Sequence, residues 1–78
     1  VARLIEASSQ RKVSRMRYFS ASNNREKDYV VHPHQVAYFD GGLYLVAFVP
    51  EYGQLRNFAA ERIRTFTPTE QTFTPVVQ

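Results

Sequence analysis

Apolar residues recur along the chain first at the spacing of a helix and then at the spacing of strands. Leu4, Ile5 and Ser8 fall at helical spacing, which predicts a short helix over residues 1–10. After that helix the period changes to two, so that alternate side chains share one face, as they do in a β-strand. The pattern therefore predicts a short helix followed by a β-domain.

The segments with strand periodicity are short, and a turn follows each one. They cover residues 11–18, 27–33, 35–39, 43–49, 54–59 and 64–67. A helical turn is expected over residues 60–63, just before the last of them. Short strands with closely spaced turns are typical of a small closed or nearly closed barrel. We therefore expect a mainly β fold of about five strands.

The segment 43–49 is apolar at both alternating sets of positions, which predicts a central strand buried on both faces. Asp40-Gly41-Gly42 precedes it and supplies the positive φ angles that a tight hairpin needs. Pro33 is expected at the end of a strand or at an edge, because proline has no N–H to donate. The side chains expected in the core are those of Met16, Leu45, Val46, Phe48 and Ile63.

Seventy-eight residues without a cysteine make one small domain that no disulfide can stabilise. We expect the domain over residues 1–66, with the barrel over 13–66 and a Thr- and Pro-rich tail or linker over 67–78. The chain begins with valine, and we take it to be a piece of a longer protein. No apolar run is long enough to span a membrane, and the start lacks a signal peptide, so a cytoplasmic location is expected.

The chain carries ten lysines and arginines against seven acidic residues, for a net charge of +3. Eight of the ten cations are arginine, whose planar fork of donors suits carboxylates and phosphates better than the point charge of lysine. This composition favours an anionic partner.

Five blocks of the sequence, in order, resemble the WYL domain, a family named for a Trp-Tyr-Leu triplet. The blocks are Met16-Arg17-Tyr18-Phe19-Ser20, Val31-His32-Pro33-His34, Leu43-Tyr44-Leu45, Leu55-Arg56-Asn57-Phe58 and Glu61-Arg62-Ile63. The resemblance covers about residues 3–66. Leu43 stands where the family name has tryptophan, which removes an aromatic ring and an indole donor at that position.

The resemblance implies an Sm-like, SH3-type β-barrel that senses a ligand in bacterial transcription regulators. Such domains follow a helix-turn-helix or winged-helix domain, which would bind duplex DNA in place of this chain. The ligand would be a small anion, a nucleotide or a single-stranded nucleic acid. Position by position, the implied ligand-binding residues are Tyr18, His34, Tyr44, Arg56 and Arg62. Arg56 and Arg62 would hold the anion together.

Other chemistries have little support. His32 and His34 alternate on a strand, but a metal site needs three or four ligands and no supporting spacing accompanies them. The serines lie in no nucleophile motif, and there is neither a carboxylate pair nor a glycine-rich phosphate loop. We therefore expect no enzyme activity, no metal and no cofactor.

Two alternatives to a ligand sensor stay open. In the first, the barrel is structural, and the arginines pair across the interface of a homodimer. In the second, the barrel binds single-stranded nucleic acid through charge and aromatic stacking without base preference. The arginines could also pair with Glu61 or Asp28, or lie in solvent.

Overall fold

The protein is described here by a computed structural model in which residues 2–75 are placed. Val1 and residues 76–78, which belong to the predicted helix and tail, lie outside the described residues. The elements are α1 (Ala2–Gln10), β1 (Lys12–Ser20), β2 (Arg25–Phe39), β3 (Gly42–Val49), β4 (Gln54–Ala59), the 3-10 helix η1 (Ala60–Arg62) and β5 (Ile63–Thr72). The predicted mainly β fold with a short N-terminal helix is confirmed.

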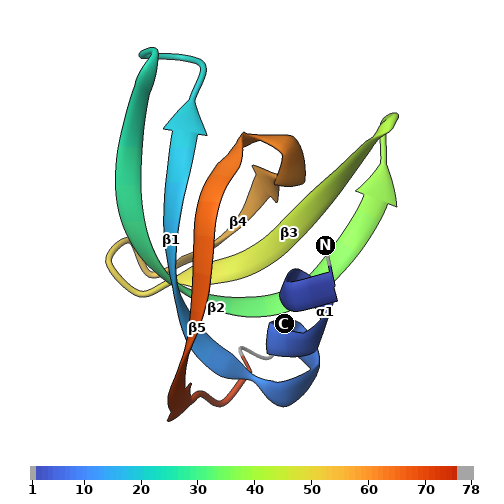
Figure 1. Ribbon diagram of the computed structural model, residues 1–78, viewed down its shortest axis with the longest axis vertical. Helices are drawn as coiled ribbons and strands as arrows, with labels where there is room; N and C mark the ends of the chain where they lie inside the picture. Colours follow the sequence, from blue (N-terminus) through green and yellow to red (C-terminus); the bar gives the residue numbers. More distant parts are fainter. Residues whose placement is uncertain (1, 76–78) are drawn as a thin grey trace.

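The five strands form one antiparallel sheet in the order β4-β3-β2-β1-β5. β3 lies between β2 and β4, as its two apolar faces predict. The edge strands β4 and β5 follow each other in the chain, and η1 connects them (Figure 1). In the described part of the chain, no pairing between these edges closes the sheet, so the barrel itself stays a prediction.

The long strand β2 replaces two strands expected over residues 27–33 and 35–39. Its first half pairs with β1, where Val31 lies opposite Ser14, and its second half pairs with β3. Pro33 lies where the partner changes, next to a register shift between Pro33 and Gln35. The expectation that Pro33 ends a strand was wrong, because a bulge also removes the need for an N–H in the ladder.

The core lies on one face of the curved sheet, and α1 covers part of it with Leu4 and Ala7. Leu45 and Met16 are buried, as expected. Val46, Phe48 and Ile63 were also expected to be buried in the core, but they are only partly buried, and of the three Ile63 packs against the core. One face of β3 is partly buried and the other belongs to the core. The side chains of the core face are those of Leu45, Ala47 and Val49.

The turn between β2 and β3 is as tight as the sequence predicts. Phe39 pairs with Gly42, which leaves Asp40 and Gly41 as a two-residue loop. Both loop residues have positive φ angles, 52° and 76°, as a type I′ turn requires. Aspartate tolerates this conformation better than most residues with a side chain, and glycine adopts it without strain.

The last strand is longer than the sequence predicts. A strand was expected over residues 64–67, whereas β5 extends from Ile63 to Thr72 and pairs with β1 along most of its length. Thr69 also donates a side-chain hydrogen bond of 2.6 Å to the carbonyl oxygen of Val13. The threonines after residue 67 therefore lie in the sheet, where β-branched side chains pack well.

Replacing Leu45 with alanine tests the position of the core. Leu45 is 0% exposed, so Leu45→Ala should lower the free energy of unfolding by about 2–5 kcal/mol, measured by urea denaturation. Val30→Ala is the matched control, since Val30 is 51% exposed and should change stability by less than about 0.5 kcal/mol. Equal losses for the two variants would contradict this placement of the core.

Candidate functional site

Tyr18, the first of the predicted ligand residues, supports the sheet. Its hydroxyl oxygen accepts a hydrogen bond of 3.0 Å from the backbone N–H of Ala59, at the end of β4. Its ring meets the edge of the Phe58 ring at a centroid distance of 5.0 Å. Tyr18 therefore links β1 to the edge strand β4 and satisfies a donor there. The hydroxyl can still donate its own proton, so a contact between Tyr18 and a ligand stays a prediction.

His34 lies on the opposite half of the sheet from Tyr18, next to the bend in β2. Its Nδ1 donates a hydrogen bond of 2.8 Å to the carbonyl oxygen of His32, because a carbonyl oxygen can only accept. The Phe73 ring stacks on the His34 imidazole at a centroid distance of 5.5 Å. One face of His34 is therefore covered by the residue that follows β5.

Tyr44 lines a hollow between the β2–β3 turn and η1. The Phe39 ring stacks on it at 4.5 Å with 15° between the planes. Gly42 makes room for this arrangement, because a Cβ atom there would lie 3.2 Å from the Tyr44 ring. The hollow has a volume of about 580 Å³. It is open to solvent and is lined by residue 38, residues 40–44 and residues 59–61.

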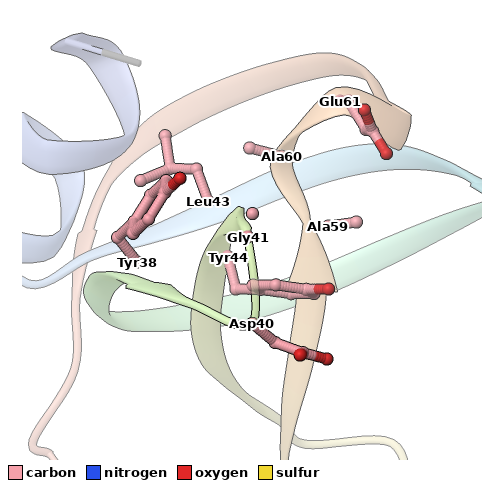
Figure 2. Close-up of a pocket in the computed structure, with 9 residues that line it drawn as sticks. Tyr38, Asp40, Gly41, Leu43, Tyr44, Ala59, Ala60 and Glu61 are labelled. Atoms are coloured by element: carbon pink, nitrogen blue, oxygen red, sulfur yellow. The ribbon is translucent and has the colours of Figure 1, made fainter.

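The chemistry of this hollow does not suit an anion. The charged residues among those that line it are Asp40 and Glu61, and neither Arg56 nor Arg62 belongs to the lining. In the view of Figure 2, the two carboxylates lie at opposite margins of the hollow, with the Tyr44 ring between them. Like charges repel, so a phosphate or carboxylate would be unfavourable here. Tyr44 is thus placed at a hollow, but one of the wrong charge for the expected ligand.

Arg56 lies on the exposed side of β4, near its start. Its guanidinium carbon lies 4.7 Å from the centroid of the Tyr52 ring, and its Nε donates a hydrogen bond of 3.3 Å to Gln54. Arg62 lies in η1, beyond the other end of β4, and is exposed. The two arginines therefore lie near opposite ends of β4. That their guanidiniums hold one anion together stays a prediction.

Arg56 belongs instead to a group of cations and tyrosines that the sequence reasoning missed. Lys27 donates a hydrogen bond to the Tyr52 hydroxyl, and its Nζ lies 4.8 Å from the centroid of that ring. The Tyr29 ring meets Tyr52 edge-on at 6.3 Å. We call Lys27, Tyr29, Tyr52 and Arg56 the Tyr52 cluster. It joins β2, the β3–β4 turn and β4.

The protonation states in the Tyr52 cluster preserve its positive charge at neutral pH. The hydrogen bond with Tyr52 raises the pKa of Lys27, and the nearby carboxylate of Glu51 acts in the same direction. Burial raises the pKa of the Tyr29 hydroxyl, so that this tyrosine stays neutral. The cluster therefore presents two cations beside a half-exposed aromatic ring. This combination can hold an anionic group and stack against a planar one.

Four charged residues on β1, β2 and β5 form ion pairs with one another. Arg17 binds Glu26 at 2.7 Å and Asp28 at 3.0 Å, and Arg64 lies 3.5 Å from Glu26. Asp28 is thus a partner of Arg17, whereas Arg56 contacts Tyr52 and Gln54. These pairs are exposed to solvent, so each contributes little to stability.

Among residues 2–75, no group of three or more histidines, cysteines, aspartates or glutamates is arranged to hold a metal ion. No helix among the described residues is both long and apolar enough to cross a membrane.

The comparison with known proteins agrees with the family resemblance seen in the sequence. A family model described as the WYL domain matches residues 1–68. Among solved structures, the chain is similar to Proteasome accessory factor B/C (PafBC) of Arthrobacter aurescens, with a TM-score of 0.82 and 24% sequence identity. The match covers 91% of this chain and 11% of that one. At this identity the likeness shows a shared fold. No curated protein matches the sequence.

Removing the Tyr18 hydroxyl distinguishes its structural link from a ligand contact. Tyr18→Phe should lower the free energy of unfolding by about 1 kcal/mol, because the Ala59 N–H loses its acceptor. Hydrogen exchange at the Ala59 amide should become faster as well. Tyr38→Phe is the control, since Tyr38 is 74% exposed and should behave like the unaltered chain. An unchanged exchange rate at Ala59 would show that the link does not form.

Proposed function

Because the chain belongs to the WYL domain family, we propose that it is the ligand-sensing module of a bacterial helix-turn-helix transcription regulator. The match over residues 1–68 supports the family assignment, and the fold shared with PafBC agrees with it. The chain spans 11% of the PafBC chain, so sequence-specific binding of duplex DNA is assigned to another domain. Recognition of an operator requires an element that enters a groove, such as a recognition helix. We propose no catalytic activity for this module.

We further propose that the sheet is an Sm-like, SH3-type barrel. Its two edge strands, β4 and β5, are consecutive in the chain, and a three-residue 3-10 helix connects them. That short link holds the end of one edge near the start of the other. The hydrogen bond between Tyr18 on β1 and Ala59 on β4 supports the same curvature, because it joins strands from opposite sides of the sheet.

The ligand proposed for this module carries an anionic group, and the Tyr52 cluster is its binding site. The observation that carries this proposal is the position of two cations on one ring: Lys27 Nζ and the Arg56 guanidinium lie 4.8 Å and 4.7 Å from the Tyr52 centroid. The nearest carboxylate is that of Glu51, whose oxygen lies 3.8 Å from Lys27, too far for a strong hydrogen bond. A phosphate between the two cations would gain charge-assisted hydrogen bonds.

The chemical class that fits best is a nucleotide or a single-stranded nucleic acid. Its phosphate would contact Lys27 and Arg56, and a base could stack on the 37% exposed ring of Tyr52. The ligand residues implied by the family resemblance differ from this set in all but Arg56. Tyr44 and His34 would then act elsewhere, and Arg62 would contribute only if the ligand extends along β4.

Binding measurements on arginine variants test the proposed site. Titration of the chain into a labelled oligothymidylate, followed by fluorescence anisotropy, should show weaker binding for Arg56→Ala by about one to two decades. Arg56→Lys should recover part of that loss, since a point charge cannot reproduce the planar fork. Arg15→Ala serves as the control, because Arg15 is an exposed arginine of β1 outside the cluster.

The outcomes separate the competing functions. A loss for Arg62→Ala equal to that for Arg56→Ala would replace the Tyr52 cluster by the shared site of the two arginines. Binding that falls steeply with salt and ignores the base would favour a general single-strand binder. Flat titrations, together with a change in oligomeric state for Arg56→Ala, would contradict the sensor and favour a dimerisation barrel.

A further inference from the structure

The strand β5 lies at an edge of the sheet and turns part of its backbone away from its neighbour. Within residues 2–75, β5 is the last strand in the sheet order, next to β1. The carbonyl oxygen of Phe66 accepts a hydrogen bond of 3.3 Å from Nη1 of Arg3, which lies in α1. The Phe66 carbonyl therefore points away from β1 and towards the helix.

The register of β5 shows which other backbone groups point the same way. Pairing with β1 runs without a shift from Thr65 to Pro68, so the N–H and C=O groups alternate in direction along these residues. The Phe66 N–H therefore points outward like its carbonyl, whereas the groups of Thr65 and Thr67 face β1. Pro68 falls in the outward set, where its missing N–H leaves no gap in the ladder with β1. This placement of proline agrees with the direction that Arg3 indicates.

A groove of about 520 Å³ lies between this edge and α1, which Figure 1 shows next to β5. We call it the β5 groove. Arg3 and Leu4 line it from α1, Ala60 lines it from η1, and residues 63–67 line it from β5. An added strand would lie about 4.7–4.9 Å from β5. Arg3 reaches across the groove to Phe66, so its guanidinium takes the place of the N–H that such a strand would supply.

The side of the β5 groove that faces the core is apolar. Leu4 and Phe66 belong to the core cluster, and the partly buried Ile63 packs against it. Thr65 and Thr67, by contrast, are exposed on the opposite face of β5. Because residues paired across two strands share a face, a residue opposite Phe66 would turn its side chain towards the apolar surface. The groove therefore suits a strand whose alternate side chains are apolar.

The charged side chains that line the groove are both cations, those of Arg3 and Arg64. Arg64 lies 3.5 Å from Glu26 and over the ring of Phe19, so it is already engaged in part. The hydrogen bond of Arg3 goes to an uncharged carbonyl oxygen. Acidic side chains at the remaining positions of an added strand would offer Arg3 an ion pair in place of that contact, because a guanidinium and a carboxylate have matching geometry.

A second copy of this chain is a less favourable occupant of the groove. Its edge strands would be β4, which contains Arg56 and no acidic residue, and β5, which carries Arg64 at the groove. The chain has a net charge of +3, so two such edges would bring like charges together. Charge complementarity therefore favours a separate, acidic segment.

We propose that the β5 groove binds an extended, acidic segment of a partner protein, which adds to the edge of β5 as an antiparallel strand. The outward N–H and C=O of Phe66 require an acceptor and a donor on one residue, which a polypeptide backbone supplies. The apolar wall and the two arginines select a segment in which apolar and acidic side chains alternate. The groove shares no residue with the Tyr52 cluster, so this proposal and the proposed function can fail separately.

Arg3 acts in two opposite ways in this proposal. In the free chain, its guanidinium satisfies the Phe66 carbonyl and protects the edge from pairing with unsuitable strands. When the acidic segment binds, Arg3 leaves that carbonyl and pairs with a carboxylate. A neutral segment gains nothing from this exchange, so Arg3 provides specificity as well as affinity.

The experiment uses a short, fluorescein-labelled peptide of alternating valine and glutamate, with binding to the 78-residue chain followed by fluorescence anisotropy. Bound peptide should slow hydrogen exchange at the Phe66 amide by up to about tenfold when about nine-tenths of the chain is occupied, since only the free fraction exchanges. The Thr65 amide faces β1 and should change little. N-methylation of the valines removes the N–H opposite Phe66 and should abolish this protection, whereas N-methylation of the glutamates should be tolerated.

Variants of Arg3 test its two roles. Arg3→Glu should weaken binding of the acidic peptide by about tenfold, because a repulsion replaces an attraction. Arg3→Ala frees the carbonyl, so a peptide with glutamine in place of glutamate should bind this variant more tightly than the unaltered chain. Arg25→Glu is the matched control, since Arg25 is exposed at the start of β2 and lies outside the groove. Continued protection of the Leu45 amide shows that each variant is folded.

Four results would overturn the proposal. Binding of the valine-methylated peptide as tight as that of the unmodified one would mean that charge alone holds it. An equal loss for Arg56→Ala and Arg3→Glu would place the peptide at the Tyr52 cluster. Protection of the Phe66 amide that rises with the concentration of the chain alone would mean that a second copy occupies the edge. No binding at all would mean that α1 and Arg3 close the edge to every strand.

Discussion

The bend in β2 is the constraint on which the rest of the structure depends. This strand pairs with β1 before residue 32 and with β3 after it, and Pro33 lies buried where the partner changes. Proline leaves a gap in the ladder at that point, so the strand can turn and carry its two halves around one core. The Tyr52 cluster lies along the first half. The two histidines and the hollow beside Tyr44 lie along the second half.

The fold was predictable wherever local pattern decides it. The apolar run of β3, the tight turn before it and the helix at the start all follow from residues close together in the chain. The bend in β2 could not be predicted in this way. A proline in an apolar segment indicates the end of a strand, unless it is known that the strand changes its pairing partner there. The length of β5 was missed for a related reason. Its threonines and Pro68 resemble a linker, and only their pairing with β1 stabilises them as a strand.

The candidate site was predictable in part, and the residues that the sequence did not indicate were missed for one physical reason. The family resemblance found Arg56 because that position lies in a recognisable block. It could not find Lys27 and Tyr52, because they meet Arg56 only through the sheet, from β2 and from the β3–β4 turn. The sequence of the turn held one indication, because an aromatic residue such as Tyr52 in a short loop usually packs against a neighbouring element. Tyr18 was expected to bind a ligand, and this stays a prediction; what only the structure reveals is that its hydroxyl accepts a hydrogen bond from Ala59.

The net charge of +3 hides an uneven distribution, which decides how an anion would approach. Positive charge gathers at the Tyr52 cluster, whereas the hollow beside Tyr44 is lined by Asp40 and Glu61. The molecule measures 31 × 25 × 24 Å, while exposed charges are screened over about 8–10 Å at physiological salt. Charges farther apart than this act independently of one another. An anion that reached the acidic hollow would be repelled by Asp40 and Glu61. Under the proposed function, an anionic ligand would therefore be directed to the Tyr52 cluster rather than to the hollow.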